Sequence, residues 1–223
     1  MSSNRRTLLG ALALSPATLP MALTVQAEQT NLIAADICTL QPRLTEGPYY
    51  IDPYLLREDI TEGRPGCAVN LALQVVDSLC RPVEGLRVDI WHCDAQGRYS
   101  GFEREGTAGE TFLRGTQPTD AQGVARFLTI FPGWYPGRAP HVHFKVFPDE
   151  RRELTSQIFF DDSRASAIYE GDPAYARSGA RSTFNRNDGL AQKAGPAARA
   201  RLREVDGVLQ SALVVGIGDT GAA

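Results

Sequence analysis

Short apolar runs that alternate with polar positions dominate the chain from residue 69 onward. The segment 69–79 (VNLALQVVDSL) has the two-residue period of a half-buried strand. Similar runs, bounded by Gly, Pro and Asp, follow at 86–93, 124–131, 141–147, 155–160 and 207–217. This spacing predicts an all-β protein: an antiparallel β-sandwich core with long irregular loops and few short helices.

The remaining segments show weaker patterns. Residues 28–66 are rich in Pro, Gly and Asp and show little periodicity, so we expect an irregular arm there. The best helix-forming stretch is short and covers 194–205 (AGPAARARLREV). No repeat or linker divides the chain, and we therefore expect one domain over 28–223.

The first 27 residues differ from the rest. A basic start at Arg5 and Arg6 leads into a weakly apolar stretch without acids, which ends in the small-residue pattern 25–27 (VQA). This predicts an export signal over 1–27. The arginine pair followed by Thr-Leu-Leu resembles a twin-arginine signal, which would send the folded protein to the periplasm. A general secretory signal and a disordered cytoplasmic tail are the alternatives.

Composition narrows the class of protein. With 43% hydrophobic residues and a formal net charge of −3, the chain looks globular and is not basic enough for a general nucleic-acid binder. No apolar run after residue 30 is long enough to span a bilayer. The sequence leaves a homo-oligomer open.

Cysteine number is informative in an exported chain. The 4 cysteines predict two disulfides, with three pairings open. No C-x-x-C pair is present, which argues against a structural zinc cluster. The cysteines are Cys38, Cys67, Cys80 and Cys93.

Two of the chain's 3 histidines, His141 and His143, lie one residue apart in a predicted strand. Successive side chains of a strand point to opposite faces, so both imidazoles share one face and can converge on a metal. The alternative is an exposed polar pair, and H-x-H by itself is a weak signal. Residues 124–148 contain no Asp, Glu or Cys that could complete a metal site.

Tyrosines offer the missing donors. Tyr135 lies at a Pro-flanked turn after one apolar strand, and Tyr99 follows another strand in the same way. A phenol with an ordinary pKa of about 10 loses its proton at neutral pH only to a strongly Lewis-acidic metal, and Fe(III) meets this need better than zinc. Two phenolates, two neutral imidazoles and one hydroxide balance the charge of Fe(III), which a poorly solvated site requires.

Two long motifs carry a family resemblance. The stretches 83–101 (VEGLRVDIWHCDAQGRYSG) and 129–144 (TIFPGWYPGRAPHVHF) resemble the signature of the intradiol ring-cleavage dioxygenases. The shorter segments TEGPYY (45–50) and TSQIFF (155–160) fit as well, so the resemblance covers roughly residues 40–190. It implies a β-sandwich core, a small aromatic diol and O2 as substrates, and non-haem Fe(III) held by Tyr99, Tyr135, His141 and His143.

The resemblance also implies roles for the neighbours of these ligands. Tyr135 matches the tyrosine that leaves the metal when substrate binds, and Arg138 is a cation beside the ligands that would stabilise negative charge on the substrate. Gln157 lies where the family places a glutamine. Tyr49 and Tyr50 are expected in the aromatic pocket or in the core. His92 is assigned no role.

Some features depart from the best-known members. The interval between Tyr135 and His141 is shorter than in the protocatechuate enzymes, which shortens a loop over the site. The resemblance therefore does not identify which catechol is the substrate. We also expect no counterpart in these residues of the long helical N-terminal region of catechol dioxygenases. In size it is closer to a protocatechuate dioxygenase subunit.

Two other classes of protein remain alternatives. A periplasmic copper or zinc protein could use H-x-H on a sandwich, although Phe147 and Pro148 stand where a cupin would place its glutamate. A transthyretin-like sandwich could serve as a binding module without catalysis. The combined tyrosine and histidine set favours the dioxygenase, because a binding module does not need all four side chains.

Overall fold

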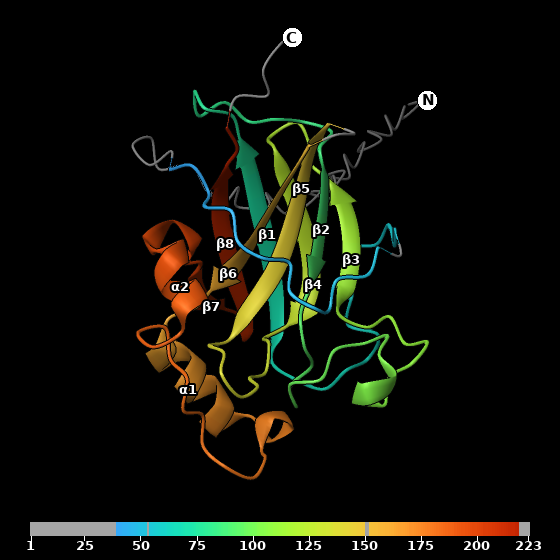
Figure 1. Cartoon of the computed structure of the whole chain (residues 1–223), viewed down its shortest axis with the longest axis vertical. Coiled ribbons are helices and arrows are strands. Elements are labelled where there is room, and N and C mark those ends of the chain that lie inside the picture. Colours follow the sequence, from blue (N-terminus) through green and yellow to red (C-terminus); the bar gives the residue numbers. More distant parts are fainter. Residues whose placement is uncertain (1–38, 53, 150–151, 219–223) are drawn as a thin grey trace, which may run out of the picture. The chain divides into compact units, whose positions relative to one another are not determined.

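Two four-stranded sheets make up most of the computed structural model, which describes residues 39–52, 54–149 and 152–218. The first sheet has the order β4-β1-β8-β7 and contains β1 (Ala68–Val76), β4 (Val124–Ile130), β7 (Arg201–Val205) and β8 (Val208–Gly216). The second has the order β3-β2-β5-β6 and contains β2 (Arg87–Trp91), β3 (Arg114–Pro118), β5 (His141–Asp149) and β6 (Arg152–Phe159) (Figure 1).

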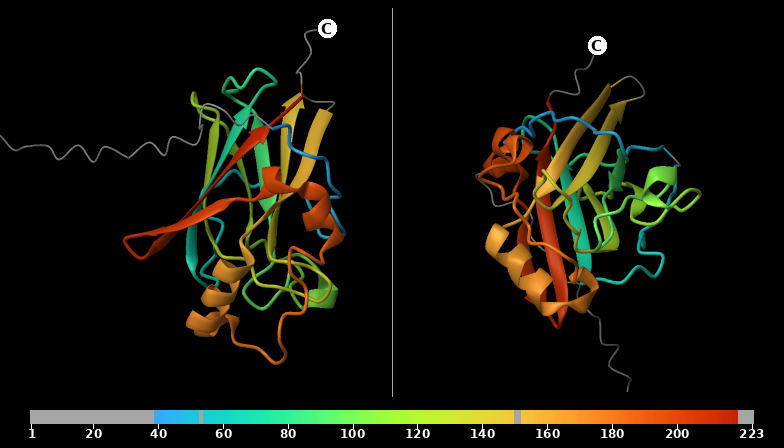
Figure 2. Two further views of the ribbon diagram at one scale, coloured as in Figure 1. Left: turned by 90° about the vertical axis from the view of Figure 1, so that its left-hand side faces the viewer. Right: turned by 60° about the horizontal axis from the view of Figure 1, so that its bottom comes forward.

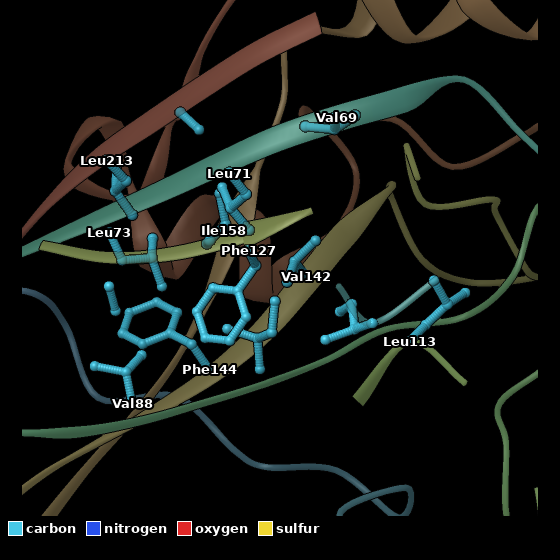
Figure 3. Packing of buried hydrophobic residues seen from close by; sticks show 14 of the residues in the cluster. Val69, Leu71, Leu73, Val88, Leu113, Phe127, Val142, Phe144, Ile158 and Leu213 are labelled. Atoms are coloured by element: carbon cyan, nitrogen blue, oxygen red, sulfur yellow. The ribbon is translucent and has the colours of Figure 1, made fainter. Parts of the chain in front are cut away.

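Both sheets contribute to one hydrophobic core. Leu71 and Leu73 of β1 and Phe127 of β4 belong to the same buried cluster as Val142 and Phe144 of β5 (Figure 3). Burial of these apolar side chains is the main favourable term in folding. On β5 the core residues alternate with the histidine pair, so the same strand packs in the core with one face and supports a candidate site with the other.

Strand pairing differs in one place from the predicted antiparallel arrangement. All pairs within the two sheets are antiparallel except β1 with β8, which runs parallel from Val69 opposite Leu209 to Val76 opposite Gly216. A parallel pair needs a long crossover connection. The chain between these two strands provides one, since it passes through the other six strands.

The helix predicted over 194–205 is wrong. Gly195 has a positive φ of 65° and precedes a proline, and only the short 3₁₀ turn Pro196–Ala198 follows it. The chain then forms β7, which pairs with β8 across a turn at Asp206 and Gly207, both with positive φ. Asp-Gly is a preferred two-residue hairpin turn, so the sequence contained a strand signal that we missed.

Three further elements were not predicted. β3 has the sequence RGTQP, which shows no apolar alternation. Helix α1 (Asp162–Gly171) begins after Asp161, whose carboxylate accepts hydrogen bonds from two backbone N–H groups of the first turn. Helix α2 (Gly189–Ala194) is capped in the same way by Asp188. The other 3₁₀ turns are Glu103–Glu105 and Pro173–Tyr175.

The described part of the predicted arm is irregular and crosses the outer face of β5 and β6 (Figure 1). The backbone N–H of Leu44 donates to the Thr155 carbonyl at 2.9 Å. Lys145, on the same face of β5 as the histidines, is 2.8 Å from a carboxylate oxygen of Glu46. These contacts hold the arm over the face that carries the histidine pair.

The cysteine prediction is corrected in part. Cys80 is disulfide-bonded, whereas Cys67 and Cys93 are free thiols, so the chain does not form two disulfides. Cys93 is a buried free thiol in an aromatic cluster with Trp91 and Tyr99. The predicted export signal over 1–27 lies outside the described residues. Within residues 39–52, 54–149 and 152–218, no helix is long and apolar enough to cross a membrane.

Candidate metal centre

The side chains proposed as metal ligands come from one end of the second sheet. β2 and β5 are antiparallel neighbours with Trp91 opposite His143, so the loop that leaves β2 lies beside the loop that enters β5. Tyr99 is in the first of these loops and Tyr135 is in the second. Figures 1 and 2 show both loops at the same end of the strands.

Four side-chain donors converge there. The His141 Nε2 atom is 3.1 Å from His143 Nε2, 3.1 Å from the Tyr135 hydroxyl and 3.5 Å from the Tyr99 hydroxyl. Ligands bound at about 2.0–2.2 Å to one ion are separated by roughly 3.0–3.6 Å at ordinary coordination angles. The spacing of these donors therefore fits a single metal ion between them.

The orientation of His141 favours coordination through Nε2. Its other ring nitrogen, Nδ1, is 2.7 Å from the Ala139 carbonyl oxygen and must therefore carry the proton. Such a hydrogen bond fixes the ring and leaves the Nε2 lone pair free, as in many metal sites. The His143 ring is instead held by stacking on Trp91 at 4.9 Å, and its Nδ1 has no partner within the described residues.

Burial controls the protonation of all four groups. It lowers the pKa of His141 to about 3 and that of His143 well below its ordinary value, so both imidazoles are neutral and able to bind a metal. Burial also raises the pKa of Tyr135 to about 12 and that of Tyr99 well above its usual range. Both phenols therefore stay protonated at neutral pH unless a strong Lewis acid binds them.

Arg138 and Gln157 lie next to this set. The Arg138 Nη1 atom is 3.3 Å from His141 Nε2, and its Nη2 donates to the Gln157 side-chain oxygen at 2.5 Å. Gln157 is fully buried, and its amide nitrogen donates to the Thr45 carbonyl at 3.1 Å. Both side chains are therefore fixed beside the candidate ligands.

Tyr49 and Tyr50, which were predicted together, have different surroundings. The Tyr49 ring stacks on Tyr99 at 4.1 Å and meets Tyr135 edge to face at 6.5 Å, so it is part of the site. The Tyr50 hydroxyl donates to Asp89 at 2.9 Å, and its ring packs on Trp91. Only Tyr49 adjoins the candidate metal ligands.

His92 is placed elsewhere. It is fully buried, with Nε2 at 2.7 Å from the Thr129 hydroxyl and Nδ1 at 2.9 Å from the Cys93 carbonyl oxygen. Both ring nitrogens are thus engaged in hydrogen bonds, and the one from Nε2 links the end of β2 to β4. This arrangement agrees with a structural histidine.

Sequence reasoning missed one charged residue of the site, Asp188. One of its carboxylate oxygens accepts hydrogen bonds from Arg138 Nε at 2.9 Å and from the Ala139 backbone N–H at 2.8 Å. In the sequence, Asp188-Gly189 signals only a turn or a helix start, and its distance along the chain from Arg138 hides the pairing.

An all-β chain with two phenols and two imidazoles converging in a buried cluster defines a class of candidate mononuclear metal proteins. Comparison narrows the class: residues 45–178 match the family model described as "Dioxygenase". The chain belongs to the intradiol ring-cleavage dioxygenase family.

Individual relatives agree with this assignment. The chain is 33% identical over 150 residues to the protocatechuate 3,4-dioxygenase beta chain of Burkholderia cepacia, covering 60% of this chain and 64% of the relative. It is 32% identical over 149 residues to hydroxyquinol 1,2-dioxygenase of Corynebacterium glutamicum, covering 57% and 45%. The match therefore spans about half to two thirds of the length of these curated relatives.

A solved structure matches over more of its length. The intradiol ring-cleavage dioxygenase from Tetranychus urticae superposes with a TM-score of 0.76 and 34% identity. The similarity covers 83% of this chain and 98% of that one. The two sheets and the loops between them therefore follow the architecture of this family.

Proposed function

We propose that this protein is an Fe(III)-dependent dioxygenase that opens a catechol-type ring between its two hydroxyl carbons and releases a muconate-type diacid. The observation that carries the proposal is that three other donors, the Tyr99 hydroxyl, the Tyr135 hydroxyl and His143 Nε2, all lie within 3.5 Å of His141 Nε2. We also infer that the two sheets, which share one core, are the layers of a β-sandwich with this site at one end.

The donor set suits ferric iron. Tyr99, Tyr135, His141 and His143 would hold the ion, and two phenolates with one hydroxide would neutralise its charge in a site where three of the four donors are buried. The raised phenol pKa values mean that a weakly acidic divalent ion would leave these tyrosines protonated. When bound, Fe(III) supplies the Lewis acidity that activates a catecholate toward dioxygen.

The two tyrosines have different proposed roles. Tyr99 is completely buried beneath Tyr49, whereas Tyr135 is partly exposed in its loop. Tyr135 is thus the phenolate that can move aside, and its oxygen would accept a proton from a substrate hydroxyl as the substrate enters. Tyr99 stays in place and fixes the geometry of the centre.

Arg138 supplies the positive charge on the substrate side. Its guanidinium cannot be deprotonated at neutral pH, and Nη1 points toward the ligand cluster. It would stabilise the dianionic substrate and the negative charge that develops on the ring carbon before attack on dioxygen. Gln157 would hold the guanidinium through its side-chain oxygen.

The substrate we propose is a small aromatic diol, with O2 as the second reactant. Relatives of this chain are named for protocatechuate, catechol and hydroxyquinol. We further propose that the chain is exported to the periplasm by the twin-arginine signal at its start. Neither a nucleic acid nor a membrane span enters the proposal.

Colour provides the primary test. Purified protein loaded with iron should be burgundy from tyrosinate-to-Fe(III) charge transfer, and should take up oxygen with at least one of catechol, protocatechuate and hydroxyquinol. A colourless protein with bound zinc, or a blue-green one with copper, would instead support the alternative metal protein. Tight binding of a diol without oxygen uptake by the iron-loaded protein would support the binding module.

A further inference from the structure

Each nitrogen of the Arg138 guanidinium has a different neighbour. Nε donates to Asp188 at 2.9 Å, Nη2 donates to Gln157 at 2.5 Å, and Nη1 lies 3.3 Å from His141 Nε2. Once His141 binds a metal through Nε2, this nitrogen can no longer accept a hydrogen bond. Nη1 is then the one nitrogen of Arg138 without an acceptor among the described residues, and it faces the ligand cluster.

Asp188 is built to hold this orientation. Its side chain is 2% exposed, and the oxygen that binds Arg138 also accepts the Ala139 backbone N–H at 2.8 Å. The other oxygen accepts the N–H groups of Leu190 and Ala191 at the start of α2. Burial opposes ionisation of the carboxyl, but the Ala139 N–H and the Arg138 charge outweigh it and hold the pKa of Asp188 below its ordinary value.

We propose that Asp188 is a positioning residue for the ring-cleavage reaction: it fixes the plane of the Arg138 guanidinium so that Nη1 faces the substrate. The inference rests on the proposed function, because it assigns the reason why Arg138 must be oriented. An arginine side chain free in solution has many rotamers, and a carboxylate on Nε together with Gln157 on Nη2 leaves essentially one. Asp188 itself touches no candidate ligand and acts through Arg138.

Asp188→Asn tests the proposal because asparagine is also a good helix cap and preserves the start of α2. We expect the variant to keep its iron and its burgundy band, while kcat falls about 10- to 100-fold, as for other residues that support a metal-site side chain. KM should change much less, since the lost interaction is made mainly in the transition state. Unchanged kcat in Asp188→Asn would overturn the proposal.

Asp161→Asn is the matched control. Asp161 caps α1 through Ser163 and Arg164 as Asp188 caps α2, and neither of those partners belongs to the site. Its replacement should leave kcat within about twofold of the parent. An equal loss of kcat in both variants would assign the effect to helix capping and count against a positioning role.

A double-mutant cycle separates action through Arg138 from a general structural effect. In an Arg138→Ala background, Asp188→Asn should change kcat by less than about twofold, because the side chain that it orients is absent. If the second substitution costs the same factor with or without Arg138, Asp188 does not act through it and the proposal fails.

A measurement that does not depend on catalysis allows this inference to be tested separately from the proposed function. In metal-free protein, the Arg138 Nε–H should give a protected ¹⁵N NMR signal, assigned by its loss in Arg138→Lys. We expect Asp188→Asn to shift this signal and to speed its exchange with water at least tenfold, whereas Asp161→Asn leaves it unchanged. Failure of wild-type protein to cleave diols would refute the dioxygenase alone; an unmoved signal in Asp188→Asn would refute the ion-pair orientation alone.

Discussion

Tyr99 and Tyr135 offer the same chemical group to the candidate metal centre, but their side chains differ in how freely they can move. Tyr99 is fully buried against Tyr49, while Tyr135 belongs to a Pro- and Gly-rich loop and is partly exposed. A buried donor fixed by stacking suits permanent coordination, and a partly exposed one suits reversible coordination. The two residues should therefore respond differently to loss of the hydroxyl.

Tyr99→Phe should lose iron and the charge-transfer band together, because the remaining donors cannot replace a buried anionic oxygen. Tyr135→Phe should retain iron with a shifted band, and its kcat should fall at least about 100-fold, the scale of a lost general base. Iron content and visible spectra measure both outcomes.

Tyr175→Phe provides the control for loss of a buried hydroxyl elsewhere. Its hydroxyl donates to the Phe131 carbonyl at 2.7 Å and accepts the Cys67 backbone N–H at 3.1 Å, so the substitution should cost about 1–3 kcal/mol of stability without loss of iron. Full iron and normal turnover in Tyr99→Phe would exclude Tyr99 as a ligand.

Buried histidines also make the metal-free protein sensitive to acid. Burial lowers the pKa of His141 to about 3 and of His92 to about 4, from an ordinary value of 6.5. At a pH between the lowered pKa of the folded protein and 6.5, each of these histidines binds a proton in the unfolded chain but not in the folded one. The contribution of the neutral histidines to folding stability is therefore complete above pH 6.5 and is lost as the pH falls. The free energy of unfolding should decrease by about 1.4 kcal/mol per pH unit for each histidine.

Urea unfolding of metal-free protein from about pH 7 to about pH 4 measures this dependence. In a His92→Gln variant, the free energy of unfolding should depend less steeply on pH, by the contribution of one titrating group. This difference separates the effect of the histidine from that of the carboxylates, which titrate in the same pH range. Stability that increases on acidification would contradict the assigned neutral state.

At the scale of single elements, β5 organises the site. His141 and His143 alternate with Val142 and Phe144, and all four are buried, so neither face of the strand meets water. The core fixes one face, and the arm closes the other through Lys145 and its ion pair with Glu46. The spacing of the two imidazoles follows from the regular geometry of the strand.

The β7–β8 hairpin is the element in which local turn chemistry decided the structure. Gly207 has a φ of 77°, which L-residues other than Asn and Asp rarely adopt. Gly207→Ala should therefore destabilise the protein by about 1 kcal/mol, measured by thermal or urea unfolding. Gly171→Ala is the control, because Gly171 ends α1 without positive φ and with open space at its Cβ; a larger loss there would contradict the argument.

At the scale of the whole molecule, the candidate centre joins segments that are distant in sequence. The loop after β2, the loop before β5 and β5 itself supply the donors, and Asp188, the residue that caps α2, lies beside them. A metal bound by all of them stabilises the folded state only, since the unfolded chain cannot assemble the set. Metal content and folding stability should therefore be linked.

Removal of iron with a chelator should lower the midpoint of thermal unfolding by roughly 5–10 °C, if the free metal was present at about 100 times its Kd. Restoring Fe(III) should restore the midpoint. The same treatment of Tyr99→Phe should have almost no effect. A midpoint independent of iron in the wild type would show that the four donors do not bind it together.

The sequence by itself determined the strand-rich class, most strand positions and the chemistry available to the site. Apolar alternation is a local property, so the sequence predicted six of the strands: β1, β2, β4, β5, β6 and β8. It also predicted that His141 and His143 share one face of their strand. The motifs around Tyr99 and Tyr135 resembled one family, and the comparisons place the chain in it. The stretch that became β7 was misread because its helix-forming residues outweighed a two-residue turn.

Only the tertiary structure decided which side chains meet. The pairing of Asp188 with Arg138, the separation of Tyr49 from Tyr50 and the parallel β1–β8 pair depend on contacts between segments far apart in the chain. Local propensity carries no information about such contacts, because they are selected by how two sheets bury a common core. The same packing brings four donors within reach of one ion, which a linear pattern can suggest but not produce.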